Sequence, residues 1–268
     1  DTKWGKYLVA PSAFFKILEK AKNLVVPLQK VADVKYAIKT GANEFFCLPN
    51  RFFKIKETPD YLVLIDKGTK KERFWIEWEY VKPVLNKIKP HKSISNLKKD
   101  GYLLMCNERK TDLKKANKKV LDYIEYGETK EHVWRRTKYG GYHERPTCAS
   151  RSPWYNLNDR PKSLILSPSI YWGRHIAFFN RLGFYATDCL DEIRPFNETR
   201  AKVLCALLNS TLTALFTEFS GRYIENRDKT ISNEIKIYEL RQVPTIDPQV
   251  LVKMNPELLT KLEKVIVK

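Results

Sequence analysis

Short apolar runs divided by turn residues fill the first third of the chain, and this pattern constrains the fold more than any other feature. Val34, Tyr36 and Ile38 alternate with polar residues, as the buried face of a strand does. We expect further strands at residues 44–48, 52–55, 61–65, 74–78, 102–106, 164–166, 175–179 and 183–187. The strands do not alternate regularly with helices. The pattern therefore predicts an α+β fold, with a mixed or antiparallel sheet of short strands and packed helices.

The helices are predicted from apolar residues that recur every three or four positions. The clearest helix covers residues 199–220, and Gly221 follows its end. We expect the others at residues 11–21, 79–88, 113–126 and 256–267. Ser12 is the expected cap of the first of these. Residues 132–160 hold few apolar positions and many turn formers, which predicts a long loop or ribbon.

The charge of the chain indicates an acidic partner. Lys and Arg total 49 against 31 Asp and Glu, which gives a net charge of +18. Such an excess repels itself in a compact fold, and nucleic acid is the commonest partner that relieves it. An anionic membrane surface is the competing interpretation, but no apolar run approaches the roughly 20 residues of a membrane span. We expect no membrane partner and, without a signal peptide, a cytoplasmic protein.

Motifs of known enzymes are absent from the sequence. There is no phosphate-binding loop, no glycine-rich dinucleotide motif and no nucleophile elbow. The 5 Cys are few and widely spaced, and the 4 His lack metal-ligand spacing, so we expect neither disulfides nor a metal site. Asp188, Asp191 and Glu192 could suggest a nuclease site, but acidic residues before a helix also suit its dipole. The chain alone is therefore expected to hold no catalytic residue.

Arginine and aromatic residues are interleaved at 132–160, which we call the basic aromatic segment. It holds six Lys or Arg, two acids and five Trp or Tyr. An arginine can bind a guanine edge through two parallel hydrogen bonds, and aromatic rings can stack on bases. A solvated basic loop whose rings pack back on the sheet is the alternative. Lysines at 114, 115, 118 and 119 suit phosphate contacts or a merely solvated helix face.

Four segments, taken in order, carry a resemblance to a known family. They are the strand, Thr-Gly turn and Phe-Phe pair at 31–46, the Arg-Ser-Pro-Trp-Tyr run at 151–155, the helical residues 206–211, and Gly221-Arg222 followed by Gln-Val-Pro at 242–244. The chain resembles the TaqI-like C-terminal specificity domain of adenine-N6 DNA methyltransferases over about residues 4–247. Target-recognition domains of type I specificity subunits are similar. After Gly221-Arg222 the chain departs from the family's glycine-rich turn, which puts a close backbone approach to DNA there in doubt.

The resemblance implies a division of labour. Residues 1–247 would form a target-recognition domain for double-stranded DNA, with residues 248–268 as a C-terminal helix packed on it. A catalytic methyltransferase domain in the same parent chain would bind S-adenosylmethionine and the flipped adenine, so this chain needs no cofactor of its own. The parent would be an adenine-specific DNA methyltransferase of a restriction-modification system, and the chain from Asp1 its C-terminal portion.

The predicted DNA-binding residues come from the basic aromatic segment and from the family-like turn and Gly-Arg pair. They are Lys39, Thr40, Asn43, Arg135, Arg136, Lys138, Tyr139, Tyr142, Arg145, Arg151, Trp154, Tyr155 and Arg222. Two other functions stay open at this point. One is a general RNA-binding or nucleic-acid-binding module, and the other is a fragment of a fused restriction endonuclease and methyltransferase.

Overall fold

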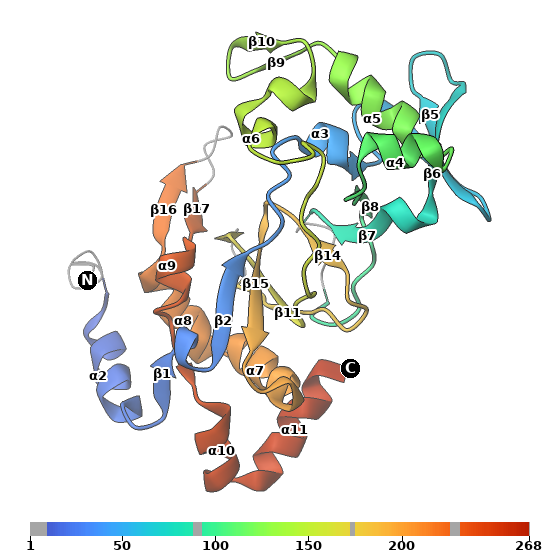
Figure 1. Ribbon diagram of the computed structural model, residues 1–268. Coiled ribbons are helices and arrows are strands. Elements are labelled where there is room, and N and C mark those ends of the chain that lie inside the picture. The colour runs from blue at the N-terminus through green and yellow to red at the C-terminus, as the bar shows by residue number, and fades with distance from the viewer. Residues whose placement is uncertain (1–9, 88–92, 172–174, 226–230, 268) are drawn as a thin grey trace. The chain divides into compact units, whose positions relative to one another are not determined.

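The computed structural model describes residues 10–87, 93–171, 175–225 and 231–267. Small antiparallel sheets and short helices make up the chain, so the predicted α+β fold is confirmed (Figure 1). The chain divides into two compact units. Unit 1 comprises Asp1–Ala37, Lys87–Lys98 and Ser163–Lys268, and unit 2 comprises Ile38–Asn86 and Lys99–Lys162. The grouping of residues 1–247 as one recognition domain stays a prediction.

Unit 1 is built on a four-stranded antiparallel sheet in the order β13, β11, β15, β2. These strands are Phe178–Phe179, Ile165–Pro168, Leu190–Pro195 and Ala32–Tyr36. Ile193 of β15 lies opposite both Ile165 and Val34, and all three side chains are buried. Phe14 and Phe216 join the same core and meet edge to face, with ring centroids 5.7 Å apart. Burial of this apolar row fixes the register of the sheet.

The long helix expected at 199–220 is two helices, α7 (Ala201–Leu208) and α8 (Thr211–Ser220). The Asn209 side chain donates to the Ala177 and Cys205 carbonyls, each at 2.8 Å, and Ser210 caps α8 by accepting from the Thr213 amide. The apolar spacing that predicted one helix runs through this break. Among the described residues no single helix could cross a membrane by length and composition, although this pair, bent by 76°, passes the same test together.

The rest of unit 1 consists of short elements around this core. They are α2 (Ser12–Ala21), β1 (Val25–Pro27), β12 (Ile170–Tyr171), β14 (Tyr185–Ala186), β16 (Arg222–Glu225), β17 (Ile231–Glu234), α9 (Ile237–Leu240), β18 (Pro244–Ile246), α10 (Pro248–Met254) and α11 (Pro256–Val267). The final helix was predicted with the bounds that α11 has. Helix α2 begins at Ser12 itself, so Ser12 is not its cap, and Pro11 takes that position without a side-chain hydrogen bond.

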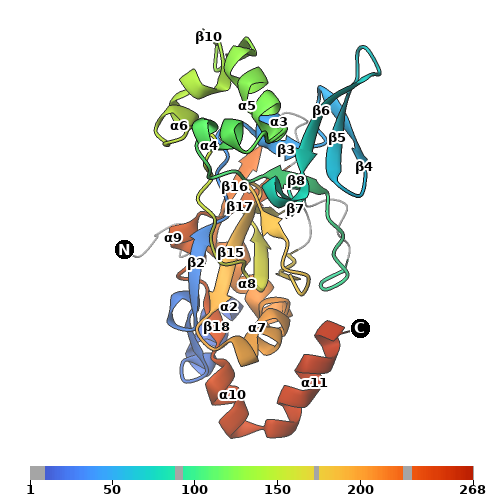
Figure 2. The ribbon, with the colours of Figure 1, turned by 45° about the vertical axis from the view of Figure 1, so that its right-hand side comes forward.

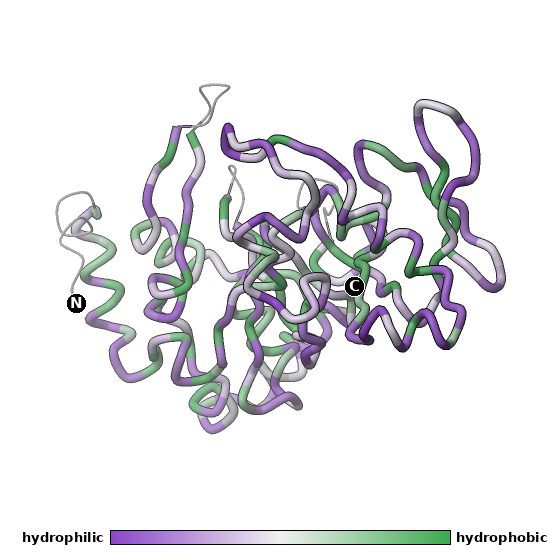
Figure 3. The backbone as a smooth tube through the Cα atoms, turned by 45° about the horizontal axis from the view of Figure 1, so that its top comes forward, coloured by the Kyte–Doolittle hydropathy of each residue, from purple (hydrophilic) through white to green (hydrophobic). Residues whose placement is uncertain are grey.

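Unit 2 contains two small sheets, a hairpin and several short helices. Its strands are β3 (Cys47–Leu48), β4 (Phe53–Glu57), β5 (Tyr61–Asp66), β6 (Glu72–Glu77), β7 (Val81–Leu85), β8 (Gly101–Leu104), β9 (His132–Trp134) and β10 (Thr137–Tyr139). Its helices are α3 (Asn43–Phe46), α4 (Lys110–Lys115), α5 (Val120–Thr129) and the single turn α6 (Pro146–Ala149). Figure 2 shows β4, β5 and β6 as an antiparallel meander beside α5. Figure 3 shows short hydrophobic stretches alternating with hydrophilic ones along the chain.

Three predictions in unit 2 are wrong in part. The helix expected at 79–88 is instead strand β7, in which Val81 and Val84 are buried and Pro83 lies opposite Tyr102 of β8. The strand expected at 44–48 begins as the helical turn α3 before it enters β3. The helix expected at 113–126 splits into α4 and α5, because Asn117 adopts a left-handed conformation with φ of 51°.

Candidate nucleic-acid interface

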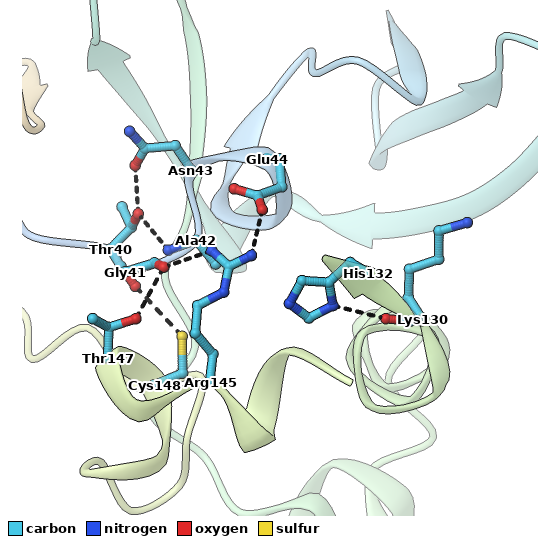
Figure 4. Close-up of polar contacts among 10 residues, drawn as sticks. All are labelled: Thr40, Gly41, Ala42, Asn43, Glu44, Lys130, His132, Arg145, Thr147 and Cys148. Atoms are coloured by element: carbon cyan, nitrogen blue, oxygen red, sulfur yellow. Dashed lines mark hydrogen bonds and ion pairs between the residues drawn. The ribbon is translucent and has the colours of Figure 1, made fainter. Parts of the chain in front are cut away.

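A tight turn at Thr40–Asn43, the Thr40 turn, leads into helix α3 of unit 2. Gly41 adopts φ of +75°, a conformation that glycine tolerates best. The Thr40 hydroxyl accepts from the Ala42 amide at 3.1 Å and also bonds to the Asn43 side chain (Figure 4). Thr40 is fully buried, whereas Lys39 and Asn43 are exposed. Only part of the turn is therefore accessible to a binding partner.

Two arginines of the basic aromatic segment, more than a hundred positions later in the sequence, form hydrogen bonds with the Thr40 turn. Arg145 donates to the Gly41 carbonyl at 2.8 Å and to the Glu44 carboxylate at 2.6 Å (Figure 4). Arg151 donates to the Thr40 carbonyl at 2.8 Å. Arg145 is only 2% exposed and Arg151 is half-buried. Both guanidinium groups thus bind the protein's own backbone, and a base contact by either one stays a prediction.

Replacing Gly41 with alanine is expected to destabilise the protein. An added Cβ would lie 2.8 Å from the Thr147 side chain, in a backbone conformation that L-residues avoid. The left-handed conformation alone costs roughly 1–2 kcal/mol, and the overlap adds to it. Urea denaturation should show a lower midpoint. Gly68→Ala, in an exposed turn outside the left-handed region, is the matched control, and an equal loss in both variants would contradict the assignment.

The aromatic residues of the segment divide between the core and the surface. Trp154, Tyr155 and Tyr142 are buried, and Trp154 and Tyr142 pack on the Phe45 ring. Two of these side chains also form hydrogen bonds within the protein. Trp154 donates to the Glu128 carboxylate at 3.0 Å, and Tyr155 donates to the Glu108 carbonyl at 2.7 Å. Burial raises the pKa of both Tyr142 and Tyr155 to about 12. These three rings therefore fit the alternative interpretation, in which the aromatic rings of the segment pack back on the protein. Stacking on a base would require them to leave the core.

One exposed part of the segment is the β9–β10 hairpin. Trp134 pairs with Thr137, which leaves Arg135 and Arg136 as a two-residue turn. Their φ values are 47° and 73°. Two-residue turns with positive φ at both positions favour Asn-Gly, and each L-residue with a Cβ there costs roughly 1–2 kcal/mol. Both side chains are exposed, and neither makes a hydrogen bond or ion pair with any described residue.

The base of this hairpin is anchored to the core of unit 2. The His132 ring stacks on Tyr142 with centroids 4.3 Å apart and on Tyr139 at 5.6 Å. The centre of the Trp134 ring lies 4.5 Å from the guanidinium carbon of Arg135 and 5.1 Å from that of Arg145. An apolar side chain, Val133, is 69% exposed on the hairpin. The result is a ribbon with a fixed base and a cationic, exposed tip.

The remaining predicted residues lie elsewhere or are already paired. Lys138 lies on β10 and pairs with Glu131 at 2.7 Å. Arg222 belongs to unit 1, where it donates to Glu239 at 3.0 Å and to the Tyr238 hydroxyl at 2.6 Å. Of the thirteen predicted residues, Arg222 is therefore the only one outside unit 2.

The structure also bears on the chemistry that the sequence left open. No group of His, Cys, Asp and Glu that could hold a metal ion occurs in the described ranges, which leave out His91. Asp191 and Glu192 come before the helical residues that Asn197 caps, but they do not lie at the helix N-terminus as expected. They lie in strand β15, where Ser169 donates to Asp191 at 2.9 Å and Arg194 pairs with Glu192 at 2.5 Å. All five cysteines are free thiols.

The chain is similar to the C-terminal domains of type II methyltransferases. Residues 1–224 match the family described as the C-terminal domain of the type II methyltransferase M.Eco57I, and the chain belongs to this family. The resemblance seen in the sequence is thereby confirmed at the level of a methyltransferase C-terminal domain.

Two known proteins are similar to parts of the chain. The type II methyltransferase M.AccI of Acinetobacter calcoaceticus is 28% identical over 187 residues, which cover 68% of this chain. The crystal structure of the type IIG restriction endonuclease BpuSI has the same fold, with a TM-score of 0.56 over 98% of this chain at 11% identity. The chain spans only 27% of M.AccI and 28% of the BpuSI chain.

Proposed function

We propose that this chain recognises a specific sequence in double-stranded DNA for an adenine-N6 methyltransferase. The catalytic domain, elsewhere in the parent chain, would bind S-adenosylmethionine and the flipped adenine. The observation that carries the proposal is the anchored β9–β10 hairpin with Arg135 and Arg136 exposed at its tip. The family membership of the chain and its net charge of +18 support the same conclusion.

The geometry of the hairpin suits the major groove of DNA. That groove is about 12 Å wide and admits a two-stranded β-ribbon. An arginine that enters it can donate two parallel hydrogen bonds to guanine, a contact worth roughly 1–3 kcal/mol of discrimination. Arg135 and Arg136 have no hydrogen-bond or ion-pair partner among the described residues to give up before they bind. The anchored base limits the entropy that the ribbon loses on binding.

The backbone strain at the tip supports the same function. Arginine occupies two turn positions where Asn-Gly would be more stable. Strained backbone conformations of this kind cluster at ligand-binding sites, where the surrounding structure holds them in place. A cost in stability at an exposed tip is explained if the two guanidinium groups are needed for binding.

Selection from a random library of duplexes tests the proposal. We expect enrichment of one short sequence, and an affinity for it that falls steeply as salt rises. A library without any enriched sequence would contradict specific recognition. Tighter binding to single-stranded RNA would favour a general nucleic-acid module instead. Magnesium-dependent cleavage by the chain alone would favour a nuclease.

A further inference from the structure

A second cationic feature of unit 2 lies at Phe52, in the turn before strand β4. The guanidinium carbon of Arg51 lies 4.5 Å from the centre of the Phe52 ring, and the Lys130 ammonium lies 4.9 Å from the same centre. Arg51 is exposed, and Phe52 and Lys130 are half-buried. Two side chains 79 positions apart in the sequence thus bring like charges to one ring.

The backbone around Phe52 is fixed and contributes a third cation. The Asn50 side-chain oxygen accepts from the Phe52 and Phe53 amides, each at 2.9 Å. The Lys67 ammonium donates to the Asn50 carbonyl at 2.7 Å, and the Lys67 amide donates to the Phe52 carbonyl at 2.9 Å. We call Arg51, Lys67 and Lys130 the Phe52 patch.

The nearby acidic groups are already engaged by other cations. Asp66 pairs with Arg73 at 3.0 Å, and Glu44 pairs with Arg145 at 2.6 Å. Within the described part of the chain, Arg51 and Lys130 form no ion pair. A single cation on an aromatic ring near the surface gains about 0.5–1 kcal/mol. A second cation at the same ring adds repulsion that a bound anion would relieve.

We propose that the Phe52 patch binds the phosphate backbone of the DNA whose bases the hairpin contacts. The inference rests on the proposed recognition of double-stranded DNA. Lys130 ends helix α5 and lies two residues before the first residue of β9, and its carbonyl contacts the His132 ring at 3.1 Å. The patch and the hairpin are therefore joined by a short, ordered link. Phosphate contacts fix the position of a protein on the duplex without reading sequence.

The double variant Arg51→Ala/Lys130→Ala tests the patch by its salt dependence. Binding to a random-sequence duplex is measured over a range of salt concentrations for the variant and the unaltered chain. The slope of log K against log salt should become shallower by about 0.9 for each phosphate that the protein no longer neutralises, or about 1.8 in total. The sequence enriched from the library should not change. The charge-preserving variant Arg51→Lys/Lys130→Arg should keep the original slope.

Lys56→Ala is the matched control, because Lys56 is an exposed lysine of the neighbouring strand β4 that pairs with Glu72 at 2.9 Å. An unchanged slope in the folded double variant would overturn the phosphate site. A change of about 0.9 in Lys56→Ala, the same per charge removed, would also overturn it, because the effect would then follow from net charge alone. Failure of the proposed function shows in a different measurement, since a library without an enriched sequence removes specificity and leaves the salt slope intact.

Discussion

Replacing Arg135-Arg136 with Asn-Gly is expected to abolish most of the sequence preference and to make the protein more stable. In the same two-residue turn, glycine removes the Cβ at the second position, and asparagine tolerates positive φ better than arginine because its short side chain can hydrogen-bond locally. Together these changes predict a gain of roughly 1–2 kcal/mol. Loss of one or two arginine–guanine contacts, at about 1–3 kcal/mol each, should weaken binding to the preferred duplex by about 10-fold or more. Chemical denaturation and competition binding measure the two effects on one preparation.

The opposite signs of these effects make the result easy to interpret. A variant that is more stable and binds less tightly cannot have lost binding through unfolding. Lys138→Ala is the control, because Lys138 lies on the same hairpin but pairs with Glu131 across an exposed surface. Such pairs contribute about 0–1 kcal/mol, so this change should leave stability nearly constant. Unchanged affinity and specificity of the Asn-Gly variant would remove the hairpin tip from the interface.

Arg145→Ala is expected to destabilise unit 2 strongly, by about 3–5 kcal/mol. The substitution would leave the half-buried Glu44 carboxylate without its charged partner and the Gly41 carbonyl with only the Thr147 hydroxyl as donor, at 3.1 Å. It would also remove the cation beside the Trp134 ring. Arg145→Lys should rescue little, because a lysine cannot donate to both acceptors in the planar geometry of a guanidinium. A denaturation midpoint close to that of the unaltered chain would contradict this role.

The pH dependence of stability gives a second test of the Arg145–Glu44 pair. Burial alone would raise the pKa of Glu44, but the hydrogen bond and charge of Arg145 hold that pKa below its ordinary value of 4.5. A carboxyl whose pKa is lowered by folding stabilises the native state above its unfolded pKa. This stabilisation is lost as pH falls through the lower, folded pKa. The difference between the unaltered chain and Arg145→Ala should therefore shrink below about pH 4.5.

These contacts change what alanine substitutions in the segment can show. From sequence alone, Arg151→Ala and Arg136→Ala are both expected to weaken DNA binding without unfolding the domain. The structure keeps that expectation for Arg136, which is exposed. The Arg151 guanidinium holds the Thr40 carbonyl, so its loss should also lower stability. For Arg151 variants, a denaturation curve should therefore be measured together with DNA binding, to separate lost contacts from lost stability.

Local patterns in the sequence predict much of this fold because they have local causes. Alternating side chains indicate strand β2, short apolar runs between turn residues indicate β4, β5, β6 and β8, and the apolar period indicates α2 and α11. The failures arise where a local signal is ambiguous. Asn209 and Ser210 interrupt a helix whose apolar period continues, and Val81 and Val84 suit a strand or a helix until their sheet partner is known.

The candidate site was harder to predict, because composition does not show which side chains are buried. Trp154 and Tyr142 are interior because they pack on Phe45, roughly a hundred positions away in the chain. The structural role of Arg145 has the same kind of cause, because its partner Glu44 also lies far away in the sequence. The exposed Arg135-Arg136 turn could be recognised only from the pairing of the strands on either side. The Phe52 patch depends on Arg51 and Lys130 meeting, which no local pattern indicates.

The assembly of unit 2 from two separate segments limits how such a domain can be exchanged between related proteins. Glu44 and Phe45 come from the first segment. Their partners come from the second: Arg145 pairs with Glu44, and the Tyr123 ring stacks on Phe45 with centroids 4.8 Å apart. A single recombination event between them would join halves from different parents and leave charges and rings without matched partners. The proposed specificity would therefore be inherited intact only when both segments move together, or when change is confined to the hairpin tip.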